Sequence, residues 1–162
     1  YPTEGMAQRG GFVKAQIRIG QEFVGPHTPE KNADLIIAME VSEALKATQY
    51  IKPGSDFLLW GHVWLPTASL LGKQGYPSLE TVKDQIARAG AKLLYLDPAS
   101  LPTYQGSVIA DNLYVLGAAV GNTSLGKILR METMRKAIEN RWPKAAEKNL
   151  YAFRCGFEMV SK

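Results

Sequence analysis

Cysteine and histidine are scarce in this chain. Its 162 residues include one cysteine, Cys155, and two histidines, His27 and His62. A disulfide framework, a CxxC motif or a cluster of cysteine and histidine ligands needs more of these residues than the chain contains. The sequence therefore excludes a structural zinc or an iron–sulfur cluster held by this chain alone.

Long apolar segments are missing as well. The longest uncharged stretch, Phe57 to Leu71, is interrupted by Gly61, His62 and Pro66. It is shorter than the roughly 20 apolar residues that a membrane helix needs. The start of the chain also lacks the pattern of a secretory signal, which is a basic segment, an apolar run and a small-residue cleavage site. We therefore expect a soluble, cytoplasmic protein with no membrane partner.

No cluster of basic residues is present. The chain has 19 Lys and Arg against 15 Asp and Glu, a net charge of +4, and the two signs are interspersed along the sequence. A nucleic-acid-binding protein normally gathers its basic residues on one face. The sequence predicts no nucleic-acid partner, and its modest positive charge suits an anionic small molecule or an acidic partner protein.

The middle of the chain alternates strand and helix patterns. Asp34–Met39 is an apolar run of strand length, and Glu40–Thr48 is helical in character. This order indicates a buried parallel strand that leads into a helix. Lys52–Gly54 predicts a turn and Phe57–Trp60 the next strand, which His62–Leu65 either continues or follows as a separate strand.

The clearest helix signal lies between Ser78 and Gly90. Ser78 can cap the helix N-terminus, and Gly90 ends the pattern. Lys92–Asp97 then predicts a strand ended by Pro98, as in a strand–helix–strand unit of an α/β fold. The helix has one apolar face, formed by Leu79, Val82, Ile86 and Ala89.

The two ends of the chain differ from this middle part. Phe12–Ile19 alternates in the manner of a strand with one buried and one solvated face. The last third is helical in period, over Val108–Val120, Met131–Trp142 and Ala145–Val160. We predict one domain over residues 1–162, a three-layer α/β fold with a mostly parallel sheet and a helical C-terminal third. An apolar stripe on its last helix consists of Ala146, Leu150, Phe153, Phe157 and Val160.

A glycine-rich segment with an arginine, Thr3 to Gly11, precedes the first predicted strand. Glycines at 5, 10 and 11 allow a close backbone approach, and Arg9 offers a two-pronged donor to a phosphate or carboxylate. The alternative is a tight loop whose glycines serve backbone geometry and whose arginine pairs with a nearby carboxylate. Residue types alone favour this structural interpretation, because a glycine-rich loop without a full fingerprint is a weak signal.

Other candidate residues favour structural roles. Asn112 lies in a largely apolar helix pattern, so it either faces an active site or bonds a neighbouring carbonyl, and we favour the second. Cys155 is expected to be a small buried side chain. Trp60 and Trp64 are core or subunit-contact residues, with the core favoured.

The segment Tyr1 to Gly11 resembles the GMAQRGG signature of the β subunit of indolepyruvate:ferredoxin oxidoreductase. It is similar, more loosely, to the Gly-x-x-x-Arg-Gly-Gly segment in the γ subunit of pyruvate and ketoisovalerate oxidoreductases. Members of this family usually begin with a strand and a Gly-x-Gly-Gly-Gln-Gly turn before this point. The resemblance therefore implies that an N-terminal strand–helix unit is missing here. Further similar segments are Ile17-Arg-Ile-Gly20, Ala33-Asp34-Leu, Ala38-Met-Glu40, Glu43-Ala-Leu45, Tyr50-Ile-Lys-Pro-Gly54, Asp111-Asn112 and Leu116-Gly-Ala118.

The resemblance implies an oxidative decarboxylation. In this family a 2-oxoacid and CoA give acyl-CoA and CO2, and electrons pass to ferredoxin or a related acceptor. Thiamine diphosphate and iron–sulfur clusters lie on other domains or subunits of the complex. We therefore expect a small, γ-type subunit that binds no cofactor alone and is inactive alone, with the thiamine-binding and iron–sulfur subunits as its partners.

If any residues of this chain touch CoA or substrate, the resemblance places them in the glycine–arginine segment and at one later asparagine. Two alternatives stay open. The chain is either a non-catalytic assembly module or an independent domain that binds CoA or a nucleotide. The candidate binding residues are Gly5, Met6, Gln8, Arg9, Gly10, Gly11 and Asn112, and no catalytic residue or metal ligand is expected.

Overall fold

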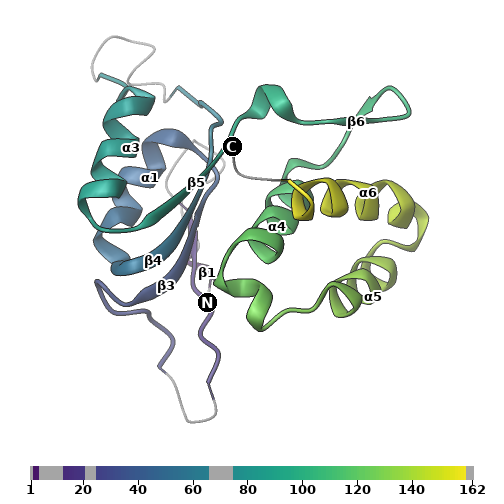
Figure 1. Ribbon diagram of the computed structural model, residues 1–162, viewed down its shortest axis with the longest axis horizontal. Helices are drawn as coiled ribbons and strands as arrows, with labels where there is room; N and C mark the ends of the chain where they lie inside the picture. Colours follow the sequence, from purple (N-terminus) through teal and green to yellow (C-terminus); the bar gives the residue numbers. More distant parts are fainter. Residues whose placement is uncertain (1, 4–12, 21–24, 66–74, 160–162) are drawn as a thin grey trace.

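The centre of the molecule is a parallel sheet of three strands in the order β3-β4-β5. This computed structural model describes residues 2–3, 13–20, 25–65 and 75–159. Strand β3 spans Ala33–Ala38, β4 spans Ile51–Trp60 and β5 spans Lys92–Leu96. In Figure 1, helices α1 (Val41–Ala47) and α3 (Leu79–Arg88) lie on one side of this sheet, and the C-terminal helices lie on the other.

Side chains of β4 alternate between two cores. Phe57 and Leu59 belong to the cluster under α1 and α3, and Leu58 and Trp60 belong to the cluster under the C-terminal helices. A parallel strand covered on both faces is apolar at every position, which explains the continuous run from 57 to 60. The expected α/β layers with a helical C-terminal third are confirmed for the described residues.

The C-terminal third contains three helices, as expected. They are α4 (Asp111–Asn122), α5 (Met131–Arg141) and α6 (Ala146–Phe157). The predicted start of the first of them was three residues early, because Ser107–Val108 (β7) pairs with Thr103–Tyr104 (β6) in a small hairpin. Short 3-10 turns connect other elements, namely η2 (Thr48–Tyr50), η3 (Pro98–Ser100), η4 (Ser124–Lys127) and η5 (Pro143–Ala145).

Helices α4 and α6 touch through their backbones. A Cβ atom added at Gly117 would lie 1.9 Å from the carbonyl oxygen of Phe153, and one added at Gly156 would lie 1.9 Å from that of Tyr114. Since real Cβ atoms do not approach so closely, only glycine permits this contact. Leu150, Phe153 and Phe157 of the predicted apolar stripe belong to this core, with Phe153 fully buried. Val160, the last predicted member of the stripe, lies outside the described residues.

The signals that flank α3 are confirmed. The Ser78 side chain accepts a hydrogen bond from the backbone N–H of Thr81 at 3.1 Å. Gly90 has a φ of 88°, in the left-handed region that favours glycine after a helix. Asp97 then accepts from the N–H of Ala99, so that β5 ends and η3 begins.

The prediction that a turn at Lys52–Gly54 separates two elements was wrong. These residues lie inside β4, where the register with β3 shifts between Ala33 and Leu35. Gly54 has a φ of 83°, and its N–H donates to the carbonyl of Gly90. The glycine thus makes an irregularity within the strand, in place of a turn before it. The strand proposed at His62–Leu65 was also wrong, because β4 ends at Trp60.

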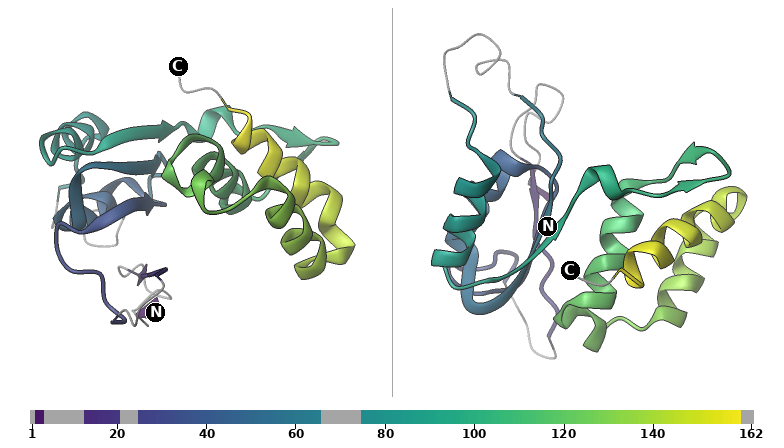
Figure 2. Two further views of the ribbon diagram at one scale, coloured as in Figure 1. Left: turned by 60° about the horizontal axis from the view of Figure 1, so that its bottom comes forward. Right: turned by 45° about the horizontal axis from the view of Figure 1, so that its top comes forward.

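The strand predicted at Phe12–Ile19 is reduced to Lys14–Ala15 (β2), which pairs with Pro2–Thr3 (β1). Its apolar face is not buried, since Val13, Ile17 and Ile19 are exposed. Figure 2 shows this short hairpin apart from the helical C-terminal part. Within the described residues, no helix has both the length and the apolar character needed to cross a bilayer.

Candidate functional site

The carboxyl ends of the three parallel strands meet at one edge of the sheet. The pairs Ala38 with Leu59 and Trp60 with Leu96 set this edge, which Glu40, Gly61 and Asp97 closely follow. Ligands of open α/β sheets bind outside the carboxyl ends of the strands. This carboxyl edge is therefore the candidate site among the described residues.

The side chain of Glu40 lies at the centre of this edge. Its Oε2 accepts hydrogen bonds from the Ser42 hydroxyl at 2.7 Å and the Glu43 N–H at 2.9 Å. Its Oε1 accepts from the Trp64 N–H at 3.2 Å and from the Tyr76 hydroxyl. A carboxylate offers about four acceptor positions, so this one is fully used. Glu40 caps α1 and at the same time ties it to two segments distant in sequence.

These contacts keep Glu40 ionised. Burial raises the pKa of its carboxyl, but the hydrogen bonds from Tyr76, Ser42 and the two backbone N–H groups outweigh burial and leave the pKa below its ordinary value. Burial and the bond to Glu40 raise the pKa of the Tyr76 hydroxyl, which stays protonated and donates. The pair is thus a fixed donor and acceptor, with no proton free to transfer near neutral pH.

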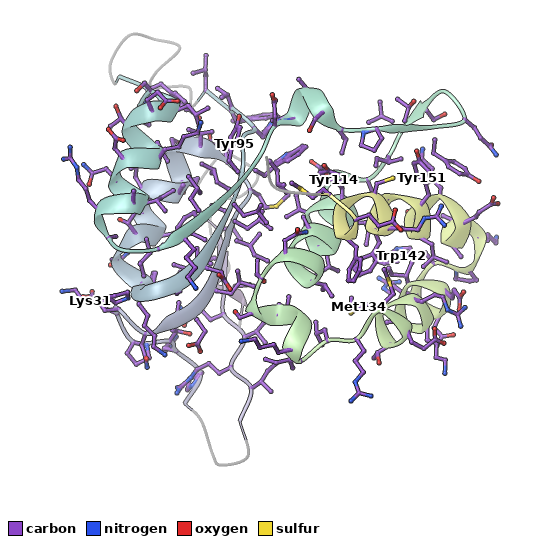
Figure 3. The ribbon with its side chains drawn as sticks, viewed as in Figure 1. Lys31, Tyr95, Tyr114, Met134, Trp142 and Tyr151 are labelled. Carbon is purple, nitrogen blue, oxygen red and sulfur yellow. The ribbon has the colours of Figure 1, made fainter. Side chains whose placement is uncertain are left out.

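A tyrosine covers the end of β4. A Cβ atom at Gly61 would lie 2.4 Å from the Tyr95 hydroxyl oxygen, so the ring occupies the place of a side chain there. The Lys83 Nζ lies 4.4 Å from the centre of the same ring, a cation–π distance. Burial and the charge of Asp97 raise the pKa of Tyr95, although Lys83 opposes them. Figure 3 places Tyr95 at the upper end of β5, with Tyr114 of α4 at the same end of the molecule.

Beyond Gly61 the chain reaches the surface with its aromatic rings exposed. The rings of His62 and Trp64 lie 6.2 Å apart at a tilt of 39°. The carbonyl of His62 accepts from the N–H of Val41 at 3.0 Å, which joins this segment to the start of α1. Exposed rings on a fixed backbone can contact a planar ligand or an apolar protein surface.

The donor set of the chain does not fit an iron–sulfur cluster. Such a cluster needs several thiolates, and the chain has only Cys155. Among the described residues, no group of three or more His, Cys, Asp or Glu side chains comes together in a way that could hold a metal ion. The carboxyl edge is suited to hold the backbone of the segment after β4 in place and to present a surface for contact.

Most of the binding residues predicted from the sequence lie outside the described residues, namely Gly5, Met6, Gln8, Arg9, Gly10 and Gly11. Asn112 is described and lies at the second position of α4, where it is exposed. Its Oδ1 accepts from the N–H of Leu113 at 2.9 Å. The expected carbonyl partner is thus replaced by a backbone N–H, because the helix begins three residues later than predicted.

Two further expectations need correction. Trp60 is in the core, as favoured, but Trp64 is exposed, because β4 ends between them and the chain leaves the sheet. Cys155 is only half-buried. Sequence reasoning also missed Glu40 and Tyr76. The position of Glu40 close after a buried strand could have drawn attention to it, whereas no local signal marks Tyr76.

Two hollows in the described part lie away from the carboxyl edge. One of about 490 Å³ is formed where α4, η4 and α5 meet, and exposed Lys127 and Arg130 contribute to it. The other, of about 200 Å³, lies at the opposite end of the sheet, beside Asp56 and Lys92. Neither includes Glu40 or the residues that contact it.

Comparison with known proteins gives a match over nearly the whole chain. Residues 1–159 match the family described as pyruvate ferredoxin/flavodoxin oxidoreductase. The indolepyruvate oxidoreductase subunit IorB of Pyrococcus horikoshii is 33% identical over 162 residues, which cover 99% of this chain and 79% of the relative. The subunit of the same name from Archaeoglobus fulgidus is 30% identical over 159 residues, 98% of this chain and 78% of the relative. No solved structure gives a significant match.

Proposed function

The chain belongs to the pyruvate ferredoxin/flavodoxin oxidoreductase family, and from this premise we propose that it is the small, γ-type subunit of a CoA-acylating 2-oxoacid oxidoreductase of the indolepyruvate or another aryl-oxoacid type. The observation that carries this proposal is the alignment of 98–99% of the chain with relatives named as indolepyruvate oxidoreductase subunits. In this proposal the chain is one part of an enzyme and is inactive alone.

The proposed reaction converts a 2-oxoacid and CoA to acyl-CoA and CO2, with electrons passed to ferredoxin or a related acceptor. Thiamine diphosphate would supply the decarboxylation chemistry from a partner subunit. A second partner would hold the iron–sulfur clusters, since one cysteine in 162 residues cannot ligate them. A cytoplasmic location belongs to the same proposal, and cell fractionation tests it.

In this proposal the carboxyl edge is the surface of this subunit that faces the reacting groups. Glu40 acts as a positioning residue there, because its four acceptor positions are taken by Ser42, Glu43, Trp64 and Tyr76. It fixes where the segment after β4 lies, and it offers no free lone pair to a substrate.

The function is tested by what co-purifies with the chain. A tagged chain expressed in its native host should bring down polypeptides that contain thiamine diphosphate and iron, together with CoA-dependent oxidation of aryl 2-oxoacids. Measurement of thiamine by fluorescence, of iron by atomic absorption and of turnover with a panel of oxoacids distinguishes the substrate class. A purified assembly without thiamine and iron would contradict the proposal.

A separate part of the proposal concerns the segment from Gly5 to Gly11. The glycines at 5, 10 and 11, with Met6, Gln8 and Arg9, would hold the phosphate or carboxylate of CoA or the oxoacid. Arg9→Ala in the intact complex should then raise a Michaelis constant while the subunits still assemble. Exposed Arg88 on α3 provides the matched control, since Arg88→Ala should change neither constant. Unchanged constants in the Arg9 variant would leave this segment without a ligand role.

One observation favours a non-catalytic assembly module as the second candidate. The polar centre at Glu40 has no unused acceptor and so contributes structure only. If Arg9→Ala changes subunit stoichiometry and leaves turnover per complex unchanged, the module is the better description. Calorimetry of the isolated chain with CoA distinguishes the oxidoreductase subunit and the assembly module from a third possibility, an independent CoA-binding domain. For that domain a tight, stoichiometric titration is expected.

A further inference from the structure

Among the six tyrosines that the structure describes, Tyr95 differs from the others in the bonding of its hydroxyl. The other five hydroxyls each have a hydrogen-bond partner, whereas Tyr95 has none among the described residues. The partners are Lys14 for Tyr50, Glu40 for Tyr76, Glu147 for Tyr104, Met159 for Tyr114 and Cys155 for Tyr151. A partly buried tyrosine hydroxyl usually finds a partner, so the described part of the chain leaves this donor without an acceptor.

The Tyr95 hydroxyl is open to a ligand. Tyr95 as a whole is half-buried. Within the described residues, the side-chain polar atoms that are both fully enclosed and unpartnered are the Ser55 hydroxyl and the Trp60 indole nitrogen. The Tyr95 hydroxyl does not belong to this enclosed pair and therefore keeps contact with solvent. A ligand oxygen that arrives from solvent can accept its hydrogen bond.

The fold holds this hydroxyl over the end of β4. Tyr95 is paired with Leu59 in the sheet, and the end of its ring lies over Gly61, the residue that follows β4. A Cβ atom at Gly61 would overlap the hydroxyl oxygen and would lie 2.7 Å from ring carbon Cε2. The Lys83 ammonium of α3 lies 4.4 Å from the ring centre. The hydroxyl is thus placed at the carboxyl edge, where ligands of open α/β sheets bind.

The charges around Tyr95 indicate which kind of oxygen would accept this hydrogen bond. Burial raises the pKa of Tyr95, Asp97 and Glu80 raise it further, and Lys83 opposes them, so the hydroxyl stays protonated and donates. Lys83 also pairs with Glu80 at 3.4 Å. Two carboxylates beside one ammonium disfavour a phosphate or carboxylate at this position, because like charges repel. An uncharged carbonyl oxygen suits the position best.

On the basis of the proposed function, we propose that the Tyr95 hydroxyl donates a hydrogen bond to an uncharged carbonyl oxygen of a substrate at the carboxyl edge. Both substrates of the proposed reaction carry such an oxygen, in the oxo group of the 2-oxoacid and in the amide groups of CoA. Tyr95 then has a different role from Glu40, which bonds only its own chain. Tyr95 touches the substrate, and Gly61 leaves the space that its hydroxyl occupies.

The test is Tyr95→Phe in the intact complex, purified from the native host. The Michaelis constant for the oxoacid or for CoA should rise about five- to tenfold, which is the effect of losing one hydrogen bond to an uncharged group. The turnover number and the subunit stoichiometry should not change, because only binding is lost. The substrate whose constant rises is the one that carries the carbonyl. Tyr104→Phe is the matched control, since the hydroxyl it removes bonds Glu147 in α6 and both constants should stay as in wild type.

A second variant displaces the hydroxyl and does not remove it. The Cβ atom of Gly61→Ala would overlap the Tyr95 hydroxyl, so this variant should raise the same Michaelis constant. Combined with Tyr95→Phe it should raise that constant no further, because both changes remove one contact. Independent, additive rises would overturn the proposal.

Wild-type Michaelis constants in the Tyr95→Phe complex would also overturn it, whether or not turnover or subunit stoichiometry falls. In that case the wild-type complex still oxidises oxoacids with CoA, and the proposed function stands. A wild-type complex without thiamine, iron and this activity would overturn the proposed function instead, so the two failures are distinguishable.

Discussion

The sheet half of the molecule and its helical half are held together in different ways. In the sheet half, one carboxylate, Glu40, gathers hydrogen bonds from α1, from the segment after β4 and from Tyr76. In the helical half, α4 and α6 meet through glycine backbones, at Gly117 and Gly156. Figure 1 shows the sheet with α1 and α3 to the left and the helical half, α4, α5 and α6, to the right.

This difference determines which changes in sequence or pH affect each half. A contact between glycine backbones tolerates no added atom, because the atom it would meet is a carbonyl oxygen of the other helix. A hydrogen-bonded carboxylate depends on partners and on protonation, and so it responds to pH and to single-atom changes. The helical half therefore has no room for an added atom at this crossing, whereas the sheet half depends on the hydrogen bonds and the ionisation of Glu40 at the edge where we place function.

The largest effect is expected in the helical half. Gly117→Ala should lower the free energy of unfolding by about 3 kcal/mol or more, because its Cβ would lie 1.9 Å from the Phe153 carbonyl oxygen. Chemical denaturation followed by circular dichroism measures this change. Gly75→Ala is the control, since nothing lies within 4 Å of its added Cβ. Equal stabilities of the two variants would show that α4 and α6 do not rely on this close approach.

The next effect concerns the sheet half and depends on pH. Tyr76→Phe should destabilise the protein by about 1–2 kcal/mol at neutral pH, because Glu40 loses a hydrogen bond to its charged form. The pKa of Glu40 in the folded protein lies below its ordinary value of 4.5. Ionised Glu40 therefore stabilises the fold fully at pH values above 4.5. This stabilisation is lost as the pH falls through the lowered pKa.

Urea denaturation of wild type and Tyr76→Phe between pH 3 and 7 checks this prediction. The two stability curves should approach each other as the pH falls through the lowered pKa of Glu40, because protonation removes the charge that the Tyr76 hydroxyl stabilises. Tyr50→Phe is a suitable control, since the Tyr50 hydroxyl accepts from Lys14 and Tyr50 directly precedes β4, at the opposite end of the sheet from Glu40. Parallel curves with a constant offset would contradict the role assigned to the Glu40 charge.

A smaller effect is expected at the start of α3. Ser78→Ala should cost about 1 kcal/mol, because the Thr81 N–H loses the side-chain oxygen that caps the helix. Thermal unfolding by calorimetry measures the loss. Ser78→Asp should restore most of it, since Asp is an equally good cap. If Ala and Asp at position 78 are equivalent, the cap contributes nothing to the sheet half.

The smallest effect is expected on α5. Arg135 bonds Glu132 at 2.8 Å and Glu139 at 2.6 Å, on an exposed helix face. Arg135→Gln should lower stability only slightly, since exposed ion pairs contribute little. The difference should vanish at about 1 M salt, which screens such pairs. A larger, salt-independent loss would mean that Arg135 stabilises the helical half in another way.

Local signals predicted much of the fold. The run from Phe57 to Trp60, the cap at Ser78 and the stop at Gly90 act over a few residues each, and the structure places them as expected. Helix α6 was expected within three residues of its bounds, because its apolar stripe has a helical period. These elements are specified by patterns that need no distant partner.

Other features depend on distant contacts, and the sequence did not predict them. Gly54 is in a strand and not a turn, because its N–H finds the carbonyl of Gly90, far along the chain. Tyr76 reaches Glu40 across a separation of 36 residues. Trp64 was expected in the core because it is large and apolar, yet β4 ends before it and leaves it exposed. The Gly5–Gly11 segment stays a prediction.

The sequence by itself determined the α/β class, the helical C-terminal third and the resemblance that led to the family, because periodicity, caps and motifs are written within short stretches of chain. Only the tertiary structure decided that Glu40 is a saturated structural acceptor and that Trp64 faces outward. Both outcomes depend on which strands end at the same edge and which segments meet there, and such meetings are fixed by packing between residues far apart in the chain.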